Sequence, residues 1–395
     1  MYANIDRTII ELETHGQRRY NFGKYPCFGL YYKPQGTKPK TAFISAHYTT
    51  DWSEHYLAEY MAKRGYGYLG WNTRFQGAPS PVGFSLDYAL IDIGLGVKWL
   101  KEVAGVEQIV LLGNSGGASL MGAYQAQAVD PHIEPDAAPR ELFDNLPACD
   151  AYISLAAHPG RARILTEWMD PSVTDESDPL SCDPELSMFN PDFGPPYDPE
   201  FVKRYRQAQV DRNERITLWA ESELQRIREG RPKGGQEISG EDAFGAQSKE
   251  GVFDRFFITP RTFADLRFLD LSLDPSKREA GCYAGDPLQA NYSGYGHPPL
   301  TSAREWLSMF SLSRTQVSLE KQMPRITQPS IVIYFNHDQG CFPSHANEAF
   351  NALGGEDKQI VALDGGHYCD GPGASRDGMA DLIGGWVEDK VGAPV

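Results

Sequence analysis

The sequence lacks long apolar runs and any clustering of basic residues at its start. No stretch approaches the roughly 18 consecutive apolar residues of a membrane-spanning helix. The first seven residues carry neither a basic segment nor an apolar core, so they do not predict a secretory signal. We therefore expect a cytoplasmic protein that has no membrane partner.

Positive charge is also scarce, because 37 Lys and Arg stand against 53 Asp and Glu, for a formal net charge of −16 over 395 residues. Such a balance disfavours nucleic acid and anionic lipid surfaces as partners. It also weighs mildly against a polyanionic substrate, although a local basic pocket could override that trend. A small-molecule substrate is expected, and assembly into a homo-oligomer is left open.

The cysteines lack the spacing of metal sites. None of the six forms a C-x-x-C pair, and the scattered His and Asp residues show no ligand spacing, so neither a metal nor a cofactor is expected. Free thiols in a reducing compartment are the favoured interpretation. Cys341 and Cys369 each lie close to a candidate site residue named below, and packing is favoured over a functional disulfide for this pair.

Short apolar runs alternate with helical patterns in the first third of the chain. Runs at 8–12 and 27–32 predict two antiparallel strands. Further strands are predicted at 41–46, 67–71, 109–112 and 150–155, with helices at 53–64 and 88–103 between them. This alternation predicts a mostly parallel sheet that is covered by helices on both faces.

The alternation stops at about residue 160 and resumes near 322. The intervening stretch contains one long helical pattern at 199–229, a polar loop at 231–251 and a shorter helical pattern at 262–271. Strands at 330–335 and 358–363 and helices at 344–353 and 375–390 then complete the pattern. We divide the chain into a core at 1–159, an insertion at 160–321 and the rest of the core at 322–395.

A serine lies at a sharp predicted turn between strand and helix. The motif Gly113-Asn114-Ser115-Gly116-Gly117 follows an apolar strand and precedes a helix of small residues, as in a G-x-S-x-G nucleophile elbow. Side chains at the two outer glycines would clash where strand and helix approach each other. The turn would present the serine hydroxyl at a helix N-terminus, where amides point outward.

An acid and a histidine follow the last two predicted strands. Asp338 lies after the strand at 330–335, and His367 follows 358–363 and two glycines. Parallel strands place their carboxyl ends at one edge, so both residues can reach Ser115 there. Asp364 and Asp370 compete with Asp338 for the acid role, and Asp338 is favoured.

These motifs together resemble the α/β-hydrolase superfamily, over about residues 1–158 and 322–395. The resemblance implies an α/β-hydrolase fold whose mainly helical cap is inserted between the sixth and seventh strands. It implies Ser115 as nucleophile, His367 as base and Asp338 as acid. Residues 46–49 (Ala-His-Tyr-Thr) match the family's oxyanion turn, and residues 72–77 (Asn-Thr-Arg-Phe-Gln-Gly) resemble the loop after its fourth strand.

The resemblance also implies an oxyanion hole and a pocket under the cap. By position, Thr49 and Gly116 would supply backbone amides, and Tyr48, which replaces the usual glycine, is a substitute donor. The acid loop is one residue longer before Pro343 than the common pattern. His158, at the end of the sixth strand, and Trp168 are candidates for contact with substrate. A structural role at the start of the cap is favoured for His158, and most aromatic residues of the insertion are expected to form the core of the cap.

The leading hypothesis is a serine esterase that cleaves a carboxylic ester or lactone of a bulky, largely apolar substrate through an acyl-enzyme. The same triad would also serve a carbon–carbon bond hydrolase or an acyltransferase, which the fold alone does not distinguish. A catalytically silent binding protein of the same fold is the alternative outside enzymes. A dehalogenase or epoxide hydrolase is disfavoured, because those use an aspartate at the elbow.

Overall fold

The computed structural model describes residues 4–15, 26–76, 83–136, 138–230, 251, 254–293 and 300–395. The predicted polar loop at 231–251 lies outside these residues except for Gly251, as does Gly77 of the loop at 72–77.

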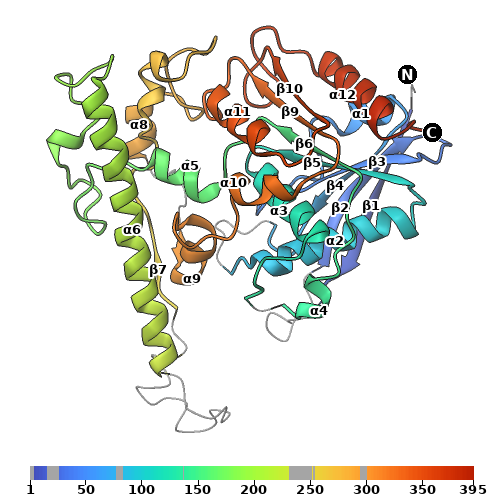
Figure 1. Cartoon of the computed structure of the whole chain (residues 1–395), viewed down its shortest axis with the longest axis horizontal. Helices are drawn as coiled ribbons and strands as arrows, with labels where there is room; N and C mark the ends of the chain where they lie inside the picture. The colour runs from blue at the N-terminus through green and yellow to red at the C-terminus, as the bar shows by residue number, and fades with distance from the viewer. Residues whose placement is uncertain are drawn as a thin grey trace.

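An eight-stranded sheet forms the centre of the molecule (Figure 1). Its spatial order is β1-β2-β4-β3-β5-β6-β9-β10, and all neighbours are parallel except β1–β2 and β2–β4. The predicted antiparallel pair at 8–12 and 27–32 is therefore confirmed. The strands are β1 (Ile5–Glu13), β2 (Pro26–Pro34), β3 (Thr41–Ser45), β4 (Gly67–Asn72), β5 (Gln108–Asn114), β6 (Ala151–Leu155), β9 (Ser330–Phe335) and β10 (Lys358–Leu363).

Helices cover both faces of this sheet, as the alternation of strands and helices predicts. Successive side chains of a strand point to opposite faces. In β5, Ile109 and Leu111 belong to one buried cluster, whereas Val110 and Leu112 belong to another. The first cluster includes residues of α2 (Leu86–Glu102), α3 (Gly116–Val129), α4 (Arg140–Phe143) and α11 (Pro343–Ala352), and the second includes α1 (Ala58–Lys63) and α12 (Arg376–Lys390).

The chain between β6 and β9 forms a large, mainly helical insertion. The 32-residue helix α6 is its longest element and lies beside the core rather than on the sheet (Figure 1). The insertion contains α5 (Arg161–Trp168), α6 (Pro199–Gly230), α8 (Pro287–Tyr292), α9 (Ala303–Glu305), α10 (Leu319–Gln322) and a small hairpin of β7 (Phe256–Phe257) and β8 (Thr301–Ser302). Shorter helical turns occur at Pro184–Leu186, Leu266–Phe268, Leu271–Leu273, Trp306–Phe310 and Met323–Arg325.

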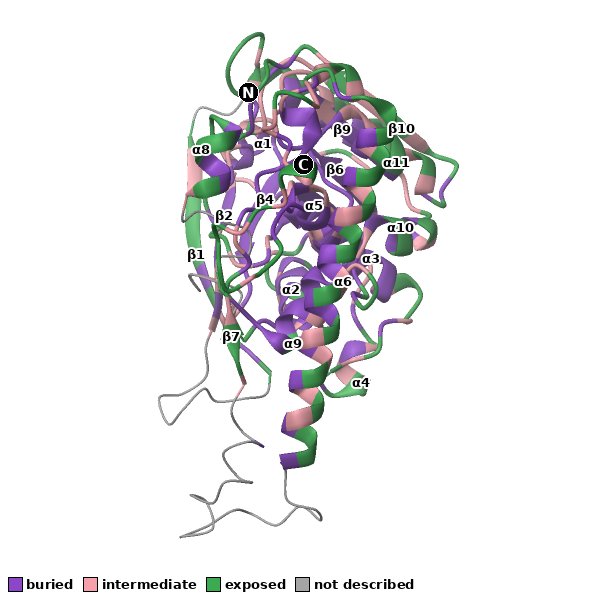
Figure 2. Cartoon of the chain, turned by 90° about the vertical axis from the view of Figure 1, so that its left-hand side faces the viewer, coloured by how far each residue is buried: buried purple, intermediate pink, exposed green. Residues whose placement is uncertain are grey.

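Helix α6 buries one stripe and exposes the other, which is visible along its whole length in Figure 2. Phe201, Tyr205 and Ile216 lie on the buried stripe at helical spacing. The stripe is partly polar, because the buried Arg212 guanidinium pairs with Glu176 at 2.6 Å and donates to the Asp170 carbonyl at 2.8 Å. None of the helices in the described part of the chain is long and apolar enough to cross a membrane.

Two predicted helices differ from the structure for the same physical reason. The helix expected at 53–64 begins only at Ala58, because Asp51 accepts from both the amide and the hydroxyl of Ser53 and holds a turn. The helix expected at 262–271 is replaced by two short 3₁₀ turns, which Asp265 and Asp270 cap through the amides two residues ahead. Asp side chains that bind nearby amides compete with helix formation.

Candidate active site

The turn between β5 and α3 holds Ser115 in an unusual backbone conformation. Its φ of 56° and ψ of −130° are sterically costly for a residue other than glycine. The Ser115 amide donates to the Leu155 carbonyl of the neighbouring strand β6 at 2.9 Å, which anchors the turn to the sheet. The strained serine therefore lies at the carboxyl edge of the sheet, directly before the first residue of α3.

Two glycines allow this turn to close. A Cβ atom on Gly113 would lie 2.3 Å from Ala118 Cα, and one on Gly117 would lie 2.5 Å from the Ala46 carbonyl oxygen. Both distances are far below van der Waals contact with backbone atoms that cannot easily move. The predicted steric requirement for glycine at both positions is confirmed.

Ser115, His367 and Asp338 form a continuous chain of hydrogen bonds. His367 Nδ1 lies 2.7 Å from Asp338 Oδ2, and His367 Nε2 lies 2.9 Å from Ser115 Oγ. A carboxylate can only accept, so Nδ1 carries the proton and Nε2 is left to accept from the serine hydroxyl. The three residues come from the loops after β5, β9 and β10, at one edge of the sheet.

The Asp338 carboxylate is buried and held by its own loop. Its Oδ1 accepts from the amides of Gly340 at 2.7 Å and Cys341 at 3.0 Å, while its Oδ2 faces the imidazole. The competing carboxylate of Asp364 is instead bonded to Lys277 and Asn336. Asp370 contributes its backbone carbonyl to the Gly366 amide. Asp338 is thus the acid whose carboxylate contacts His367.

The electrostatic setting favours a protonatable imidazole at His367. Burial by itself lowers the pKa of His367, but the charge and hydrogen bond of Asp338, together with the charge of Asp370, outweigh burial and raise it above its ordinary value. An imidazolium that forms by taking a proton from Ser115 would be stabilised by the same carboxylates. The arrangement can therefore move a proton from a serine hydroxyl to a histidine.

Comparison with solved structures gives matches that extend over nearly the whole chain. The alpha/beta hydrolase GrgF from Penicillium sp. sh18 matches with a TM-score of 0.52 at 13% identity, over 98% of this chain and 99% of that one. The esterase domain of a Rhodothermus marinus protein gives a TM-score of 0.47 at 12% identity, over 98% and 100% of the two chains. No model of a known protein family and no curated protein sequence matches the chain.

The chain has the α/β-hydrolase fold. The strand order, the strained serine after β5 and the similarity to GrgF agree on this assignment. The predicted insertion of a helical cap between the sixth and seventh strands of the sheet, β6 and β9, is confirmed with it. At such low identity the similarity establishes the fold, and the boundaries at residues 159 and 321 stay predictions.

The predicted oxyanion residues of this α/β-hydrolase-fold protein lie around the elbow. Gly116 is the first residue of α3, and Tyr48 and Thr49 follow β3. The buried Tyr48 hydroxyl lies 2.9 Å from Ser119 Oγ, and Ser119 in turn donates to the Gly116 carbonyl at 3.0 Å. Tyr48 therefore braces the first turn of α3 through its side chain, and the donor roles of all three residues stay predictions.

Two histidines flank the elbow. A Cβ atom on Gly116 would lie 3.0 Å from His47 Nε2 and 3.3 Å from His158 Nε2. The Gly160 amide donates to His158 Nδ1 at 3.2 Å, so a neutral His158 carries its proton on Nε2, the atom near the elbow. The structure thus places His158 beside the nucleophile, while its contact with substrate stays a prediction.

Trp168, the other candidate for substrate contact, lies inside an aromatic cluster of the cap. Its ring stacks on Phe263 at 5.6 Å between centroids and lies 5.7 Å from Tyr283. The cluster packs on the acid loop, because a Cβ atom on Gly340 would lie 3.9 Å from Trp168 Cζ2 and 3.8 Å from Tyr283 Cβ. Trp168 is 7% exposed, and its role toward substrate stays a prediction.

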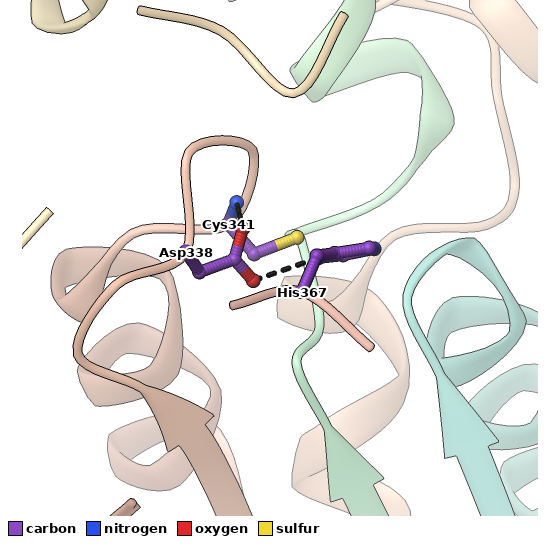
Figure 3. A group of neighbouring side chains, drawn as sticks. All are labelled: Asp338, Cys341 and His367. Carbon is purple, nitrogen blue, oxygen red and sulfur yellow. Dashed lines mark hydrogen bonds and ion pairs between the residues drawn. The ribbon is translucent and has the colours of Figure 1, made fainter. Parts of the chain in front are cut away.

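The acid loop also brings Cys341 close to Asp338 and His367 (Figure 3). Among the described residues these three form a group whose potential ligand atoms lie within 4.8 Å of one another. The group does not fit a metal, because both ring nitrogens of His367 already have partners and burial raises the pKa of the Cys341 thiol well above its usual range. All six cysteines are free thiols.

Sequence reasoning did not single out three residues that lie near the elbow, the acid loop and His367. Arg161 begins α5, Tyr283 packs on the acid loop, and the ring of Tyr368 lies 4.7 Å from that of His367. The adjacency of Tyr368 to His367 in sequence was the only signal available for this group. Arg161 and Tyr283 are brought to the site by packing between distant segments.

Proposed function

We propose that the protein is a serine hydrolase that cleaves carboxylic esters through an acyl-enzyme. The single observation that carries the proposal is the hydrogen-bonded chain from Ser115 through His367 to Asp338, with a strained serine at a strand-to-helix turn. This arrangement combines a nucleophile, a base and an orienting acid. The fold shared with GrgF supports the same reaction class.

In the first half of the reaction Ser115 Oγ attacks the ester carbonyl carbon while His367 Nε2 takes the hydroxyl proton. The Asp338 carboxylate holds His367 Nδ1–H and balances the positive charge of the imidazolium. The ester C–O bond then breaks, and the imidazolium returns the proton to the leaving alkoxide. An alcohol departs, and the acyl group stays on Ser115.

In the second half a water molecule attacks the acyl carbonyl and gives its proton to His367. Collapse of the tetrahedral intermediate releases a carboxylic acid and regenerates the Ser115 hydroxyl. The backbone amides of Gly116 and Thr49 are proposed to hold the oxyanion in both halves, each well-placed donor contributing about 3–4 kcal/mol to transition-state stabilisation.

The aromatic residues of the cap favour a bulky substrate that has a substantial apolar part. Trp168, Phe263 and Tyr283 form an aromatic cluster that rests on the acid loop next to the triad. Ligand pockets are mostly lined by such side chains, with a few polar groups that fix orientation.

The proposal is tested by hydrolysis of a p-nitrophenyl ester by purified Ser115→Ala protein. Turnover should fall on the order of 10⁶-fold, to the level of the uncatalysed reaction in practice. Ser222→Ala is the matched control, because Ser222 is exposed on α6 and its hydroxyl donates to the Trp219 carbonyl of the same helix. Retention of activity in Ser115→Ala would contradict the proposal.

A further inference from the structure

An arginine near the nucleophile elbow, Arg161, has no carboxylate partner among the described residues. Arg161 is the first residue of α5, three residues after His158, whose ring lies beside the nucleophile elbow. Its guanidinium carbon lies 4.4 Å from the centre of the Tyr48 ring. Tyr48 is the residue that braces the first turn of α3 through Ser119. Arg161 therefore faces the loop that carries the expected oxyanion amides.

A second phenol, that of Tyr283, acts on the charge of Arg161. Tyr283 interacts electrostatically with Arg161 and packs against Gly340 in the loop that supplies Asp338. Burial, with a smaller contribution from Tyr283, raises the pKa of Tyr368, whose ring lies 4.7 Å from that of His367. Arg161 thus lies against Tyr48 on the elbow side, and its charge is also influenced by Tyr283, which packs on the acid loop.

Within the described residues, Arg161 forms no ion pair. Its Nε is buried without a hydrogen-bond partner, although the residue as a whole is partly accessible. The groups that act on its charge are the phenols of Tyr48 and Tyr283, not carboxylates, and burial outweighs them and lowers the pKa of Arg161. A buried cation without an opposing charge is costly to the folded protein.

Other arginines whose side chains are largely withdrawn from solvent pair with carboxylates, as Arg161 does not in the described part of the chain. Each has a carboxylate within 2.7 Å: Arg74 with Asp92, Arg212 with Glu176, Arg261 with Asp170 and Arg267 with Asp265. Arg278 has no such short pair, but its guanidinium donates to the carbonyls of Asp274 and Arg267. Among the described residues Arg161 has neither arrangement, and it lies against Tyr48, whose hydroxyl contacts Ser119 on the helix that begins at the elbow.

We propose that Arg161 binds a carboxylate group of the substrate, so that the preferred substrates are esters that carry a free carboxylate in addition to the scissile bond. A guanidinium matches a carboxylate through two parallel hydrogen bonds, and stacking on Tyr48 fixes its plane. The substrate therefore has an apolar body that packs under the cap and one anionic end. This inference rests on the proposed function and narrows its substrate class.

The net charge of −16 does not oppose this inference. A chain with that surplus of acid repels anions at long range, but that repulsion is screened over about 8–10 Å in physiological salt. The charge of Arg161 acts inside the site, where water is partly excluded and a single opposite charge interacts more strongly.

The test compares two families of p-nitrophenyl esters with the same length. One family consists of mono-p-nitrophenyl esters of the linear dicarboxylic acids from adipic to azelaic acid, and the other carries a terminal carboxamide in place of the carboxylate. For the wild-type protein we expect a higher kcat/KM with at least one member of the acid family than with its amide. In Arg161→Gln we expect kcat/KM for that acid to fall at least about 30-fold, as for loss of one partner of a buried charge pair. The amide should change by less than about threefold.

Arg163→Gln is the matched control. It lies two residues further along α5, and its guanidinium pairs with Glu167 and Glu348 instead of lying by Tyr48. It should retain the wild-type preference for the acid family. A binding measurement that needs no turnover runs in parallel: adipate or azelate should raise the melting temperature of the Ser115→Ala protein and should fail to do so when Arg161→Gln is added.

The outcomes separate this inference from the proposed function. If the wild type hydrolyses neither family and does not react with a fluorophosphonate, the proposed function fails. If the wild type hydrolyses the amides as well as the acids, or Arg161→Gln reduces both families equally, the esterase stands and carboxylate recognition by Arg161 is wrong. A dicarboxylate that stabilises Ser115→Ala equally with and without Arg161→Gln also overturns the inference.

Discussion

His367 Nε2 lies 2.9 Å from Ser115 Oγ, although 252 positions separate the two residues in sequence. The large insertion between β6 and β9 accounts for much of this separation, yet β9 still pairs directly with β6 in the sheet. The insertion therefore leaves the sheet continuous. It adds a cap without displacing the acid and the histidine from the edge at which the serine lies.

Replacement of the acid should impair the chemical step and leave substrate binding largely intact. Asp338→Asn cannot balance the imidazolium charge or hold the same tautomer of His367, so kcat should fall by about 10⁴-fold with little change in KM. Steady-state kinetics with a p-nitrophenyl ester measure this. Asp364→Asn, which lies one residue past β10 and bonds Lys277 and Asn336, should stay within a few-fold of wild type. Equal losses in both variants would refute the assignment of the acid.

The pH dependence of kcat/KM should depend on the carboxylates around His367. The free imidazole is the active form, so kcat/KM rises with pH through the raised pKa of His367. Asp370→Asn removes one negative charge that raises this pKa. The acidic limb should therefore move to lower pH, by roughly a few tenths of a unit.

The Asp364→Asn protein is again the control, because Asp364 is not among the groups that shift the pKa of His367. The acidic limb of its kcat/KM profile should coincide with that of the wild type. A limb that moves to higher pH in Asp370→Asn would have the wrong sign for the loss of a negative charge. It would mean that another group controls the profile.

A methyl group at the elbow should destabilise the fold. In Gly113→Ala the new Cβ would lie 2.3 Å from Ala118 Cα, so β5 and α3 must separate, at a cost of about 1–3 kcal/mol in the free energy of unfolding. Ser115 would shift with them, and esterase activity should fall as well. Urea unfolding followed by tryptophan fluorescence measures the first effect.

Gly385→Ala on α12 is the matched control, since a Cβ there would meet nothing within 4 Å. It should be neutral or stabilise the protein by up to about 1 kcal/mol through higher helix propensity. If Gly113→Ala is as stable and active as Gly385→Ala, the close approach at the elbow is not a constraint.

The placement of the three candidate catalytic residues could be predicted from sequence because each is tied to a short apolar strand. Ser115, Asp338 and His367 follow strands whose carboxyl ends meet at one edge, so local patterns are enough to bring them together. The choice of Asp338 over Asp364 and Asp370 needed the same topological argument. It agrees with the hydrogen bond to His367 that the structure contains.

The helices and side-chain contacts of the cap could not be predicted from the sequence, for physical reasons. The helix predicted at 262–271 does not form, because Asp side chains accept hydrogen bonds from the amides two residues ahead. The spacing of apolar residues carries no information about this local competition. Trp168 meets Phe263 and Tyr283 through long-range packing. In the part of the chain that the structure describes, no carboxylate pairs with Arg161. Only the folded positions of the acidic residues reveal this, so no sequence pattern could have identified Arg161.

The most direct test of the account is the reaction of the protein with a fluorophosphonate, with the modified peptide located by mass spectrometry. An activated serine should be labelled once per chain, at Ser115, and labelling should disappear in Ser115→Ala and slow markedly in Asp338→Asn. Ser222→Ala, whose hydroxyl bonds the Trp219 carbonyl of α6, should react like the wild type. Absence of labelling in the folded wild-type protein, or labelling at a residue other than Ser115, would contradict the central claim.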